Sequence, residues 1–156
     1  MLSEKAKKEI EAAMQKYPNK RSAVMDALRI AQQDGGGHLE KPDMEEIGRM
    51  LDMRLVEVNA AAAFYTMYKI NKPIGKYHIQ VCRNISCSLL GAEHLIKHME
   101  KALNVKTGET TSDKKFTLST VECLGSCGTA PMMQINDDFH ENLTEQKIDE
   151  LLRKLE

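Results

Sequence analysis

Apolar residues in the first 70 positions recur every three or four residues, which is the spacing that places them on one face of a helix. Successive groups of this kind are Ile10, Ala13 and Met14, then Val24, Leu28 and Ala31, then Met44, Ile47 and Leu51. Pro18 and the glycines at 35–37 separate the first three groups, because proline and glycine interrupt helices. We therefore expect four helices, the last from about Leu55 to Tyr68.

The pattern changes at residues 71–76, where a proline and a glycine favour a hinge. Beyond this segment, the alternation of apolar and polar positions predicts four strands. They are expected at Tyr77–Cys82, Phe116–Cys123, 132–136 and 139–141. Helical spacing predicts one helix at Ser88–Leu103, between the first two strands, and another that Thr144 opens after the last strand.

The expected element order of the second half is βαβββα. A helix between two consecutive strands favours a right-handed parallel crossover, and the short connections that follow indicate a hairpin. We therefore expect an α+β protein, with a four-helix domain at 1–72 and a βαβββα domain at 73–156.

Composition limits the class of protein. The chain has 156 residues, of which 42% are apolar, and a formal net charge of −1. A chain of this size buries roughly 70% of its unfolded surface and needs no disulfides. The N-terminal stretch MLSEKAKKEIEAAMQKY is charged and helical in period, unlike an export signal. No basic cluster interleaved with aromatics indicates a nucleic-acid surface. We expect a soluble cytoplasmic protein, in which cysteines are more often ligands or catalysts than disulfides.

The four cysteines occupy matching positions around the expected crossover. Cys82 closes the first strand and Cys123 the second, while Cys87 and Cys127 lie in the loops that follow. The carboxyl ends of parallel strands lie side by side, at the edge where α/β folds place their sites. The spacings C-x4-C and C-x3-C are weak signals separately, but together they predict a four-thiolate centre.

Three interpretations of this centre remain open on the residues alone: an iron–sulfur cluster, structural zinc, or a disulfide or free thiols. Zinc usually takes tight C-x2-C pairs, whereas C-x4-C also opens plant-type [2Fe–2S] sites. Gly125, Ser126 and Gly128 would let the second loop fold its backbone close around a cluster. Ser88, or the helical turn after Cys87, would offer free backbone N–H groups to its negative charge. Met132 and Met133 beside the loop would fill gaps in the core, as methionines most often do, or shield the cluster from water.

The segments CRNISCSLLGAEHL and GETTSDKKFTLSTVECLGSCGTAPMMQINDDFHENLT closely resemble the thioredoxin-like [2Fe–2S] subunit of the NADH-dehydrogenase module of respiratory complex I. The same family supplies subunits of NAD-reducing hydrogenases and NAD-dependent formate dehydrogenases. The resemblance runs from about Tyr17 to the C-terminus and implies a thioredoxin-like second domain. It further implies that one [2Fe–2S] cluster is bound by four ligands: Cys82, Cys87, Cys123 and Cys127.

The resemblance also implies a division of labour between subunits. A larger flavoprotein would bind NADH and FMN, and this chain would hold its cluster next to that FMN, in the peripheral arm of a membrane-associated complex. The sequence agrees, since no Gly-rich dinucleotide fingerprint opens a helix after a strand. The chain is therefore expected to be a subunit of NADH:quinone oxidoreductase that is not catalytic alone. We expect its helical half to dock the flavoprotein through Phe64, Tyr65 and Met67; the alternative is that the helices bury these residues in their own bundle.

Two other classes share part of the pattern. A free-standing ferredoxin would use the same cysteines but would not need the helical half. A dithiol enzyme of the thioredoxin type would have C-x-x-C at a helix start, a spacing that the sequence lacks. The chain departs from the family at His38, where members usually carry an aromatic, and at Ala60–Ala63, where the run is usually larger. Thioredoxin-like folds often have a cis proline before the third strand, which raises that expectation for Pro131.

Overall fold

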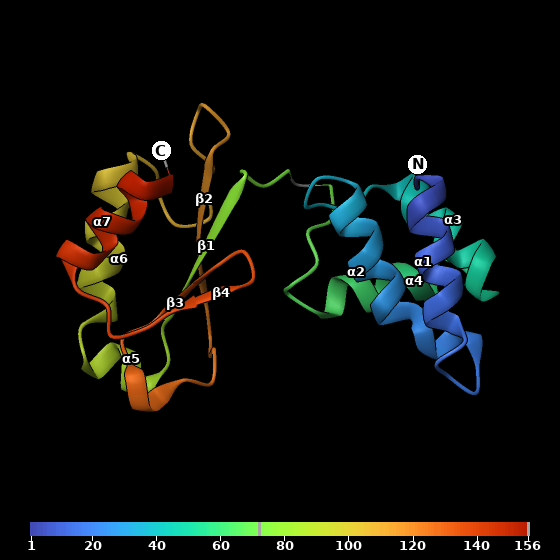
Figure 1. Cartoon of the computed structure of the whole chain (residues 1–156), viewed down its shortest axis with the longest axis horizontal. Helices are drawn as coiled ribbons and strands as arrows, with labels where there is room; N and C mark the ends of the chain where they lie inside the picture. The colour runs from blue at the N-terminus through green and yellow to red at the C-terminus, as the bar shows by residue number, and fades with distance from the viewer. Residues whose placement is uncertain (72, 156) are drawn as a thin grey trace. The chain divides into compact units, whose positions relative to one another are not determined.

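The computed structural model describes residues 1–71 and 73–155 (Figure 1). The chain divides into two compact units, Met1–Pro73 and Ile74–Glu156. The division falls beside the boundary expected at residues 72 and 73. That each side is a domain able to fold alone stays a prediction.

In its described residues, the first unit has the four α-helices that the sequence predicted and, in addition, a short 3-10 helix that it did not. Its elements are α1 (Glu4–Met14), η1 (Lys20–Ala23), α2 (Val24–Asp34), α3 (Lys41–Leu51) and α4 (Leu55–Phe64). Ser3 caps α1, since its hydroxyl accepts the N–H of Ala6 at 3.2 Å and so satisfies an N–H that the helix leaves unpaired. The core of the unit is formed by the residues that carry the helical spacing, including Ile10, Leu28, Ile47, Leu51 and Val58.

The fourth helix is shorter than expected, because it ends at Phe64 rather than at Tyr68. Tyr68 is buried, and its hydroxyl donates to the carbonyl of Met25 at 2.9 Å. The carbonyl of Lys69 accepts the N–H of Leu39 at 2.7 Å, in the loop before α3. These tertiary bonds compete with helical ones, and helical spacing in the sequence does not reveal them.

The second unit has the predicted α+β order. Its elements are β1 (Tyr77–Cys82), α5 (Ile85–Leu89), α6 (Ala92–Leu103), β2 (Phe116–Val121), η2 (Cys127–Thr129), β3 (Met133–Ile135), β4 (Asp138–His140) and α7 (Glu145–Leu155). The strands lie in the order β2-β1-β3-β4. β1 and β2 are parallel, whereas β3 is antiparallel to both β1 and β4. The predicted parallel crossover followed by a hairpin is confirmed.

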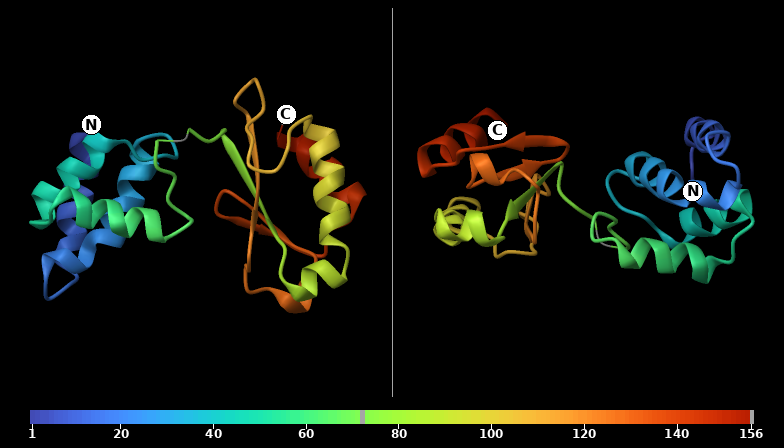
Figure 2. Two further views of the ribbon diagram at one scale, coloured as in Figure 1. Left: turned by 180° about the vertical axis from the view of Figure 1, so that it is seen from behind. Right: turned by 90° about the horizontal axis from the view of Figure 1, so that it is seen from below.

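Helices α6 and α7 cover one face of this sheet (Figures 1 and 2). Ile79 and Val81 point to that face because side chains alternate along a strand, and they share a core with Met99 of α6. His78, the residue before Ile79 on β1, forms a hydrogen bond of 2.7 Å with Ser119 of β2. The period-two pattern of the sequence therefore reports a sheet with one apolar, helix-covered face.

The helix expected at Ser88–Leu103 is in fact two helices. Gly91 has a φ of 94° and separates α5 from α6. That conformation is costly for any residue with a Cβ, so the glycine marks a real break. The break lets α5 remain at the end of β1 while α6 runs along the sheet.

The strand ends also differ from the prediction. β2 stops at Val121 rather than at Cys123, and β4 begins at Asp138, which pairs with Ile135 across a turn that includes Asn136. Asn136 adopts a left-handed φ of 54°, which asparagine tolerates in turns. Among the described residues, no helix combines the length and the apolarity needed to cross a bilayer.

Candidate metal centre

The parallel ladder brings the two cysteine-bearing segments to one end of the sheet. Cys82, the last residue of β1, is paired with Val121, the last residue of β2. The N–H of Arg83 donates to the carbonyl of Val121 at 3.0 Å, so the strands stay side by side as the loops begin. In Figures 1 and 2, α5 and the orange helical turn η2 lie at this same end.

In the first cysteine pair, Cys87 lies in a short helix rather than in the expected loop. Asn84 begins α5, where its side-chain oxygen accepts the N–H of Ile85 at 2.8 Å. Cys87 lies inside α5 and is buried. The expectation that Ser88 offers a free backbone N–H is wrong, because that N–H donates to the carbonyl of Asn84 at 2.9 Å within the helix.

The second cysteine pair lies at the surface of the protein. Cys123 and Cys127 are both exposed, in contrast to Cys82 and Cys87. Gly125 has a φ of 80°, and its N–H turns back to donate to the sulfur of Cys123 at 3.3 Å. The glycine expected to shape this loop therefore does so, by adopting a backbone conformation that other residues avoid.

The cysteine side chains of the two segments lie close enough to influence one another. The thiols of Cys87 and Cys123 both lower the pKa of Cys82. Cys127 acts electrostatically on Cys87. Two segments separated by a whole crossover thus contribute to one group of thiols.

Backbone N–H groups surround the two buried sulfurs. The N–H groups of Asn84 and Leu124 donate to Cys82, and the N–H of Met132 donates to Cys87. Sequence reasoning missed these three donors, because every residue other than proline carries an N–H and only the fold determines where it points. Such donors stabilise negative charge on sulfur.

The two buried thiols differ in acidity. Burial raises the pKa of Cys82, but the N–H groups of Asn84 and Leu124, together with the thiols of Cys87 and Cys123, outweigh it, so the pKa lies below its ordinary value. Burial raises the pKa of the Cys87 thiol, and the neighbouring Cys82 raises it further. Since the thiolate is the form that binds metal, Cys82 is the more readily deprotonated ligand of the two.

This arrangement suits an anionic group bound by sulfur. A Cβ added to Gly128 would meet nothing within 4 Å, so crowding inside the chain does not explain this glycine beside Cys127. Within residues 1–71 and 73–155, no three His, Cys, Asp or Glu side chains are arranged to hold a single metal ion. A [2Fe–2S] cluster divides its four thiolates between two iron atoms, and so differs from a one-ion site. The donors, the thiols and the glycine-rich loop fit such a cluster.

Two methionines lie on the buried side of the cysteine site. Met132 and Met133 are fully buried. Met132 packs with Cys82, Cys87 and Ala92 in a small apolar group, whereas Met133 belongs to the core between the sheet and its helices. Met132 therefore lies beside the buried cysteines and Met133 in the core; that Met132 shields a cluster from water stays a prediction. The peptide bond before Pro131 is cis, as in the thioredoxin-like folds that the sequence resembles.

The sequence profile of the thioredoxin-like [2Fe–2S] ferredoxin family matches residues 10–156. The chain belongs to this family. The expected resemblance is therefore confirmed, and with it an α+β fold whose second unit is thioredoxin-like.

Curated relatives of this ferredoxin-family protein are named as subunits of NADH-quinone oxidoreductase. One such subunit from Rhizobium meliloti (strain 1021) is 50% identical over 146 residues, which are 94% of this chain and 86% of the relative. Another, from Rickettsia conorii (strain ATCC VR-613 / Malish 7), is 47% identical over 148 residues, 94% of this chain and 88% of the relative. The likeness therefore includes the helical unit.

A solved structure shares the fold. A chain of the air-oxidized NAD+-reducing [NiFe]-hydrogenase superposes with a TM-score of 0.74 over 85% of this ferredoxin-family protein, at 23% identity. This chain spans about a fifth of that hydrogenase chain, 22% of its length. The match supports the fold of the described units.

Proposed function

We propose that this protein holds one [2Fe–2S] cluster and carries electrons within an NADH:quinone oxidoreductase of the complex I type. The ligands are Cys82, Cys87, Cys123 and Cys127. The observation that supports the proposal is the parallel β1–β2 ladder, which brings the two cysteine-bearing segments to one end of the sheet, where thiols of both segments influence one another. A bound cluster supplies one-electron chemistry, and the protein controls it through hydrogen bonds, burial and charge.

NADH and FMN belong to a flavoprotein partner in this proposal, and the cluster lies next to the FMN. The sequence has no dinucleotide fingerprint, and relatives of nearly the same length are named as subunits of NADH-quinone oxidoreductase. The protein would lie in the peripheral arm of the complex, on the cytoplasmic side. Cys123 and Cys127 are the exposed ligands, so their loop is the edge at which a redox partner approaches.

The helical unit offers a surface for that partner. Helix α4 carries apolar residues around its whole circumference, but of its ten residues only Val58 and Ala62 are buried. Helices that are apolar on all sides are usually covered. The side chain of Phe64 is 78% exposed and that of Met67 is 52% exposed, so the core of the helical unit does not cover them.

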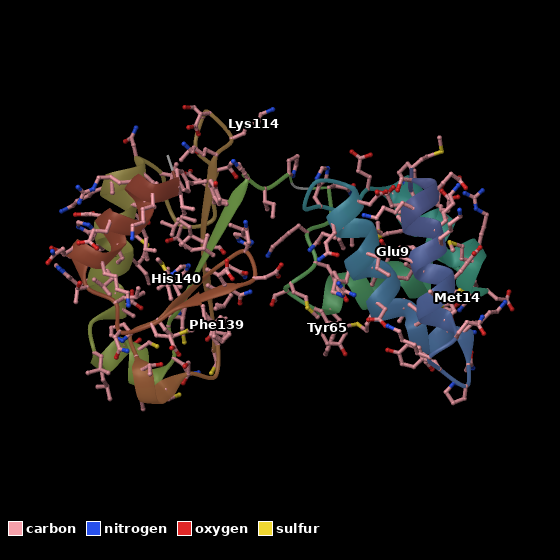
Figure 3. The ribbon with its side chains drawn as sticks, viewed as in Figure 1. Glu9, Met14, Tyr65, Lys114, Phe139 and His140 are labelled. Carbon is pink, nitrogen blue, oxygen red and sulfur yellow. The ribbon has the colours of Figure 1, made fainter. Side chains whose placement is uncertain are left out.

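The rings of Phe64 and Tyr65 meet edge to face at the C-terminal end of α4, with centroids 5.0 Å apart; Tyr65 is labelled in Figure 3. Ala60 and Ala63 are exposed on the same helix, so a partner could approach its backbone closely. We propose that the flavoprotein covers this part of α4. The alternative is that the exposed side stays in contact with water.

Two alternatives keep the cluster but change the assembly. In the first, the protein would play the equivalent part in an NAD-reducing hydrogenase or a formate dehydrogenase. In the second, it would be a free-standing thioredoxin-like ferredoxin, which would leave the helical unit without a role. Identification of the proteins that copurify with the chain separates these possibilities.

Metal analysis tests the proposed cluster. Anaerobically purified protein should be red-brown and contain iron and acid-labile sulfide in equal amounts. Single substitutions of Cys82, Cys87, Cys123 or Cys127 by Ser should abolish the cluster or destabilise it severely, because cluster binding is coupled to the folding of the loops. A colourless protein that carries zinc would refute the assignment.

A kinetic experiment tests the placement of NADH and FMN. The isolated chain should neither bind NADH tightly nor oxidise it. NADH should reduce the cluster only when the flavoprotein is added. Oxidation of NADH by the flavin-free chain alone would mean that this chain binds the nucleotide itself, against the proposal.

A further inference from the structure

Glu141 contacts the cysteine loop from outside it. It follows β4 directly after His140, which Figure 3 labels. One of its carboxylate oxygens accepts the hydroxyl of Thr129 at 2.6 Å and also the hydroxyl of Ser126. Ser126 and Thr129 lie on either side of Cys127, so a single carboxylate spans the turn that holds the fourth thiol.

The segment that carries Glu141 is itself firmly held. The N–H of Asn142 donates to the carbonyl of Thr129 at 2.7 Å, and the N–H of Leu143 donates to the carbonyl of Pro131 at 2.9 Å. Leu143 is buried in the core between the sheet and its helices. The Glu141 carbonyl accepts the Lys147 ammonium at 2.5 Å, at the start of α7. The loop is therefore tied to a rigid part of the fold.

The carboxylate is charged under ordinary conditions. The hydroxyls of Ser126 and Thr129 both lower the pKa of Glu141, and its side chain is half-buried. A negative charge in this position acts on the neighbouring loop through a medium less polarisable than water, so its effect exceeds that of an exposed charge. Addition of an electron to a thiolate-bound cluster adds one more negative charge close by.

We propose that Glu141 is a positioning residue for the Cys127 turn and that its negative charge lowers the reduction potential of the cluster. The inference rests on the proposed function, because it requires a cluster on the four cysteines. Its two parts are separable: the hydrogen-bonded tie needs an acceptor oxygen, whereas the effect on potential needs a charge. A role in folding alone would leave the potential unchanged.

Glu141→Gln separates the two parts. Glutamine keeps the length and one acceptor oxygen but removes the charge. The variant should retain its iron and sulfide, and an EPR-monitored redox titration should show a midpoint potential shifted upward. Asp137→Asn is the matched control, since it removes the same charge from the turn at the opposite end of the β3–β4 hairpin; its shift should be clearly smaller.

Glu141→Ala removes the acceptor as well. Cluster release, followed by loss of visible absorbance in the presence of a chelator, should be about tenfold faster, as expected for loss of a hydrogen bond to a charged group. Ser126→Ala should speed release less in the Glu141→Ala background than in the wild type, because the two side chains share one interaction.

The outcomes are distinct. Equal potentials in the wild type, Glu141→Gln and Asp137→Asn would overturn the electrostatic part. Release from Glu141→Ala at the wild-type rate, or additive effects of the Ser126 and Glu141 substitutions, would overturn the positioning part. A wild-type chain that binds no iron and sulfide would instead refute the proposed function.

Discussion

The backbone N–H of Met132 donates a hydrogen bond to the sulfur of Cys87. The carbonyl of Met132 accepts the N–H of Cys82 at 3.2 Å. Met132 lies after the second cysteine loop, yet its backbone holds both cysteines of the first. Since the Met132 side chain is fully buried beside the same two cysteines, its packing keeps these backbone groups in place.

Met132→Ala should therefore reduce stability. Replacing a fully buried methionine by alanine leaves a cavity and typically costs about 2–5 kcal/mol. Urea unfolding followed by circular dichroism would measure the loss. Leu89→Ala is the control, because Leu89 is 81% exposed; its effect should lie within about 0.5 kcal/mol. Equal stabilities of the two variants would contradict the packing role of Met132.

Glu57 should make the stability of the helical unit depend on pH. The backbone N–H of Arg54 and the guanidinium of Arg21 lower its pKa from the ordinary 4.5 to about 2. A carboxyl whose pKa is lower in the folded state stabilises the fold above its unfolded pKa. The stabilisation is lost as the pH falls from about 4.5 towards 2.

Glu57→Gln tests this dependence. The variant should be less stable than the wild type at pH 6, and the difference should shrink as the pH approaches 2. Thermal unfolding at a series of pH values would measure it. Glu11→Gln, at an exposed position of α1, is the control and should show a much weaker trend. A difference that is constant from pH 6 to pH 2 would exclude a contribution from the Glu57 charge.

A fragment that begins near Pro73 should keep the cluster but lose the partner. All four proposed ligands and a separate core lie in Ile74–Glu156. The fragment should therefore show the colour and the reduced-state EPR signal of the full chain, and a pull-down should show no stable association with the flavoprotein. Loss of the cluster would mean that the two units depend on each other to fold, and retained association would mean that the helical unit does not dock.

Phe64→Glu in the full chain should weaken association with the flavoprotein and leave the EPR signal unchanged. A charge placed in an apolar interface must be desolvated, so the apparent Kd should rise at least about tenfold. Ala12→Glu introduces the same side chain at an exposed position of α1 and should bind normally. Equal Kd values for the two variants would place the interface away from the end of α4.

The periodic parts of the fold could be predicted from the sequence, and the irregular parts could not. The helical spacing around Ile10 and Ile47 and the alternation around Ile79 identify faces that are buried in the structure. The break at Gly91 and the end of α4 at Phe64 were missed. Gly91 lies within an otherwise helical pattern, and the hydroxyl of Tyr68 finds its acceptor far away in the sequence.

The candidate site also has features that could be predicted from the sequence and features that could not. That the two cysteine-bearing segments lie at one end of the sheet could be predicted, because the parallel order of the strands places Cys82 beside the end of β2, two residues before Cys123. The hydrogen bonds to the sulfurs could not, since they come from backbone groups of Leu124 and Met132 that have no sequence signature. Glu141 was missed because its two hydroxyl partners lie 12 and 15 positions earlier.

The parallel crossover also determines when, during synthesis of the chain, all four cysteines are present. Cys123 follows Cys87 by 36 positions, which takes roughly 2–7 s to synthesise at about 5–20 residues per second. During that interval the first two thiols have been made and the second two do not exist. Closing the β1–β2 ladder also requires a long-range contact, which forms late compared with local helices. The complete set of four sulfurs thus exists only after Cys127 has been made, and cluster delivery belongs after that moment.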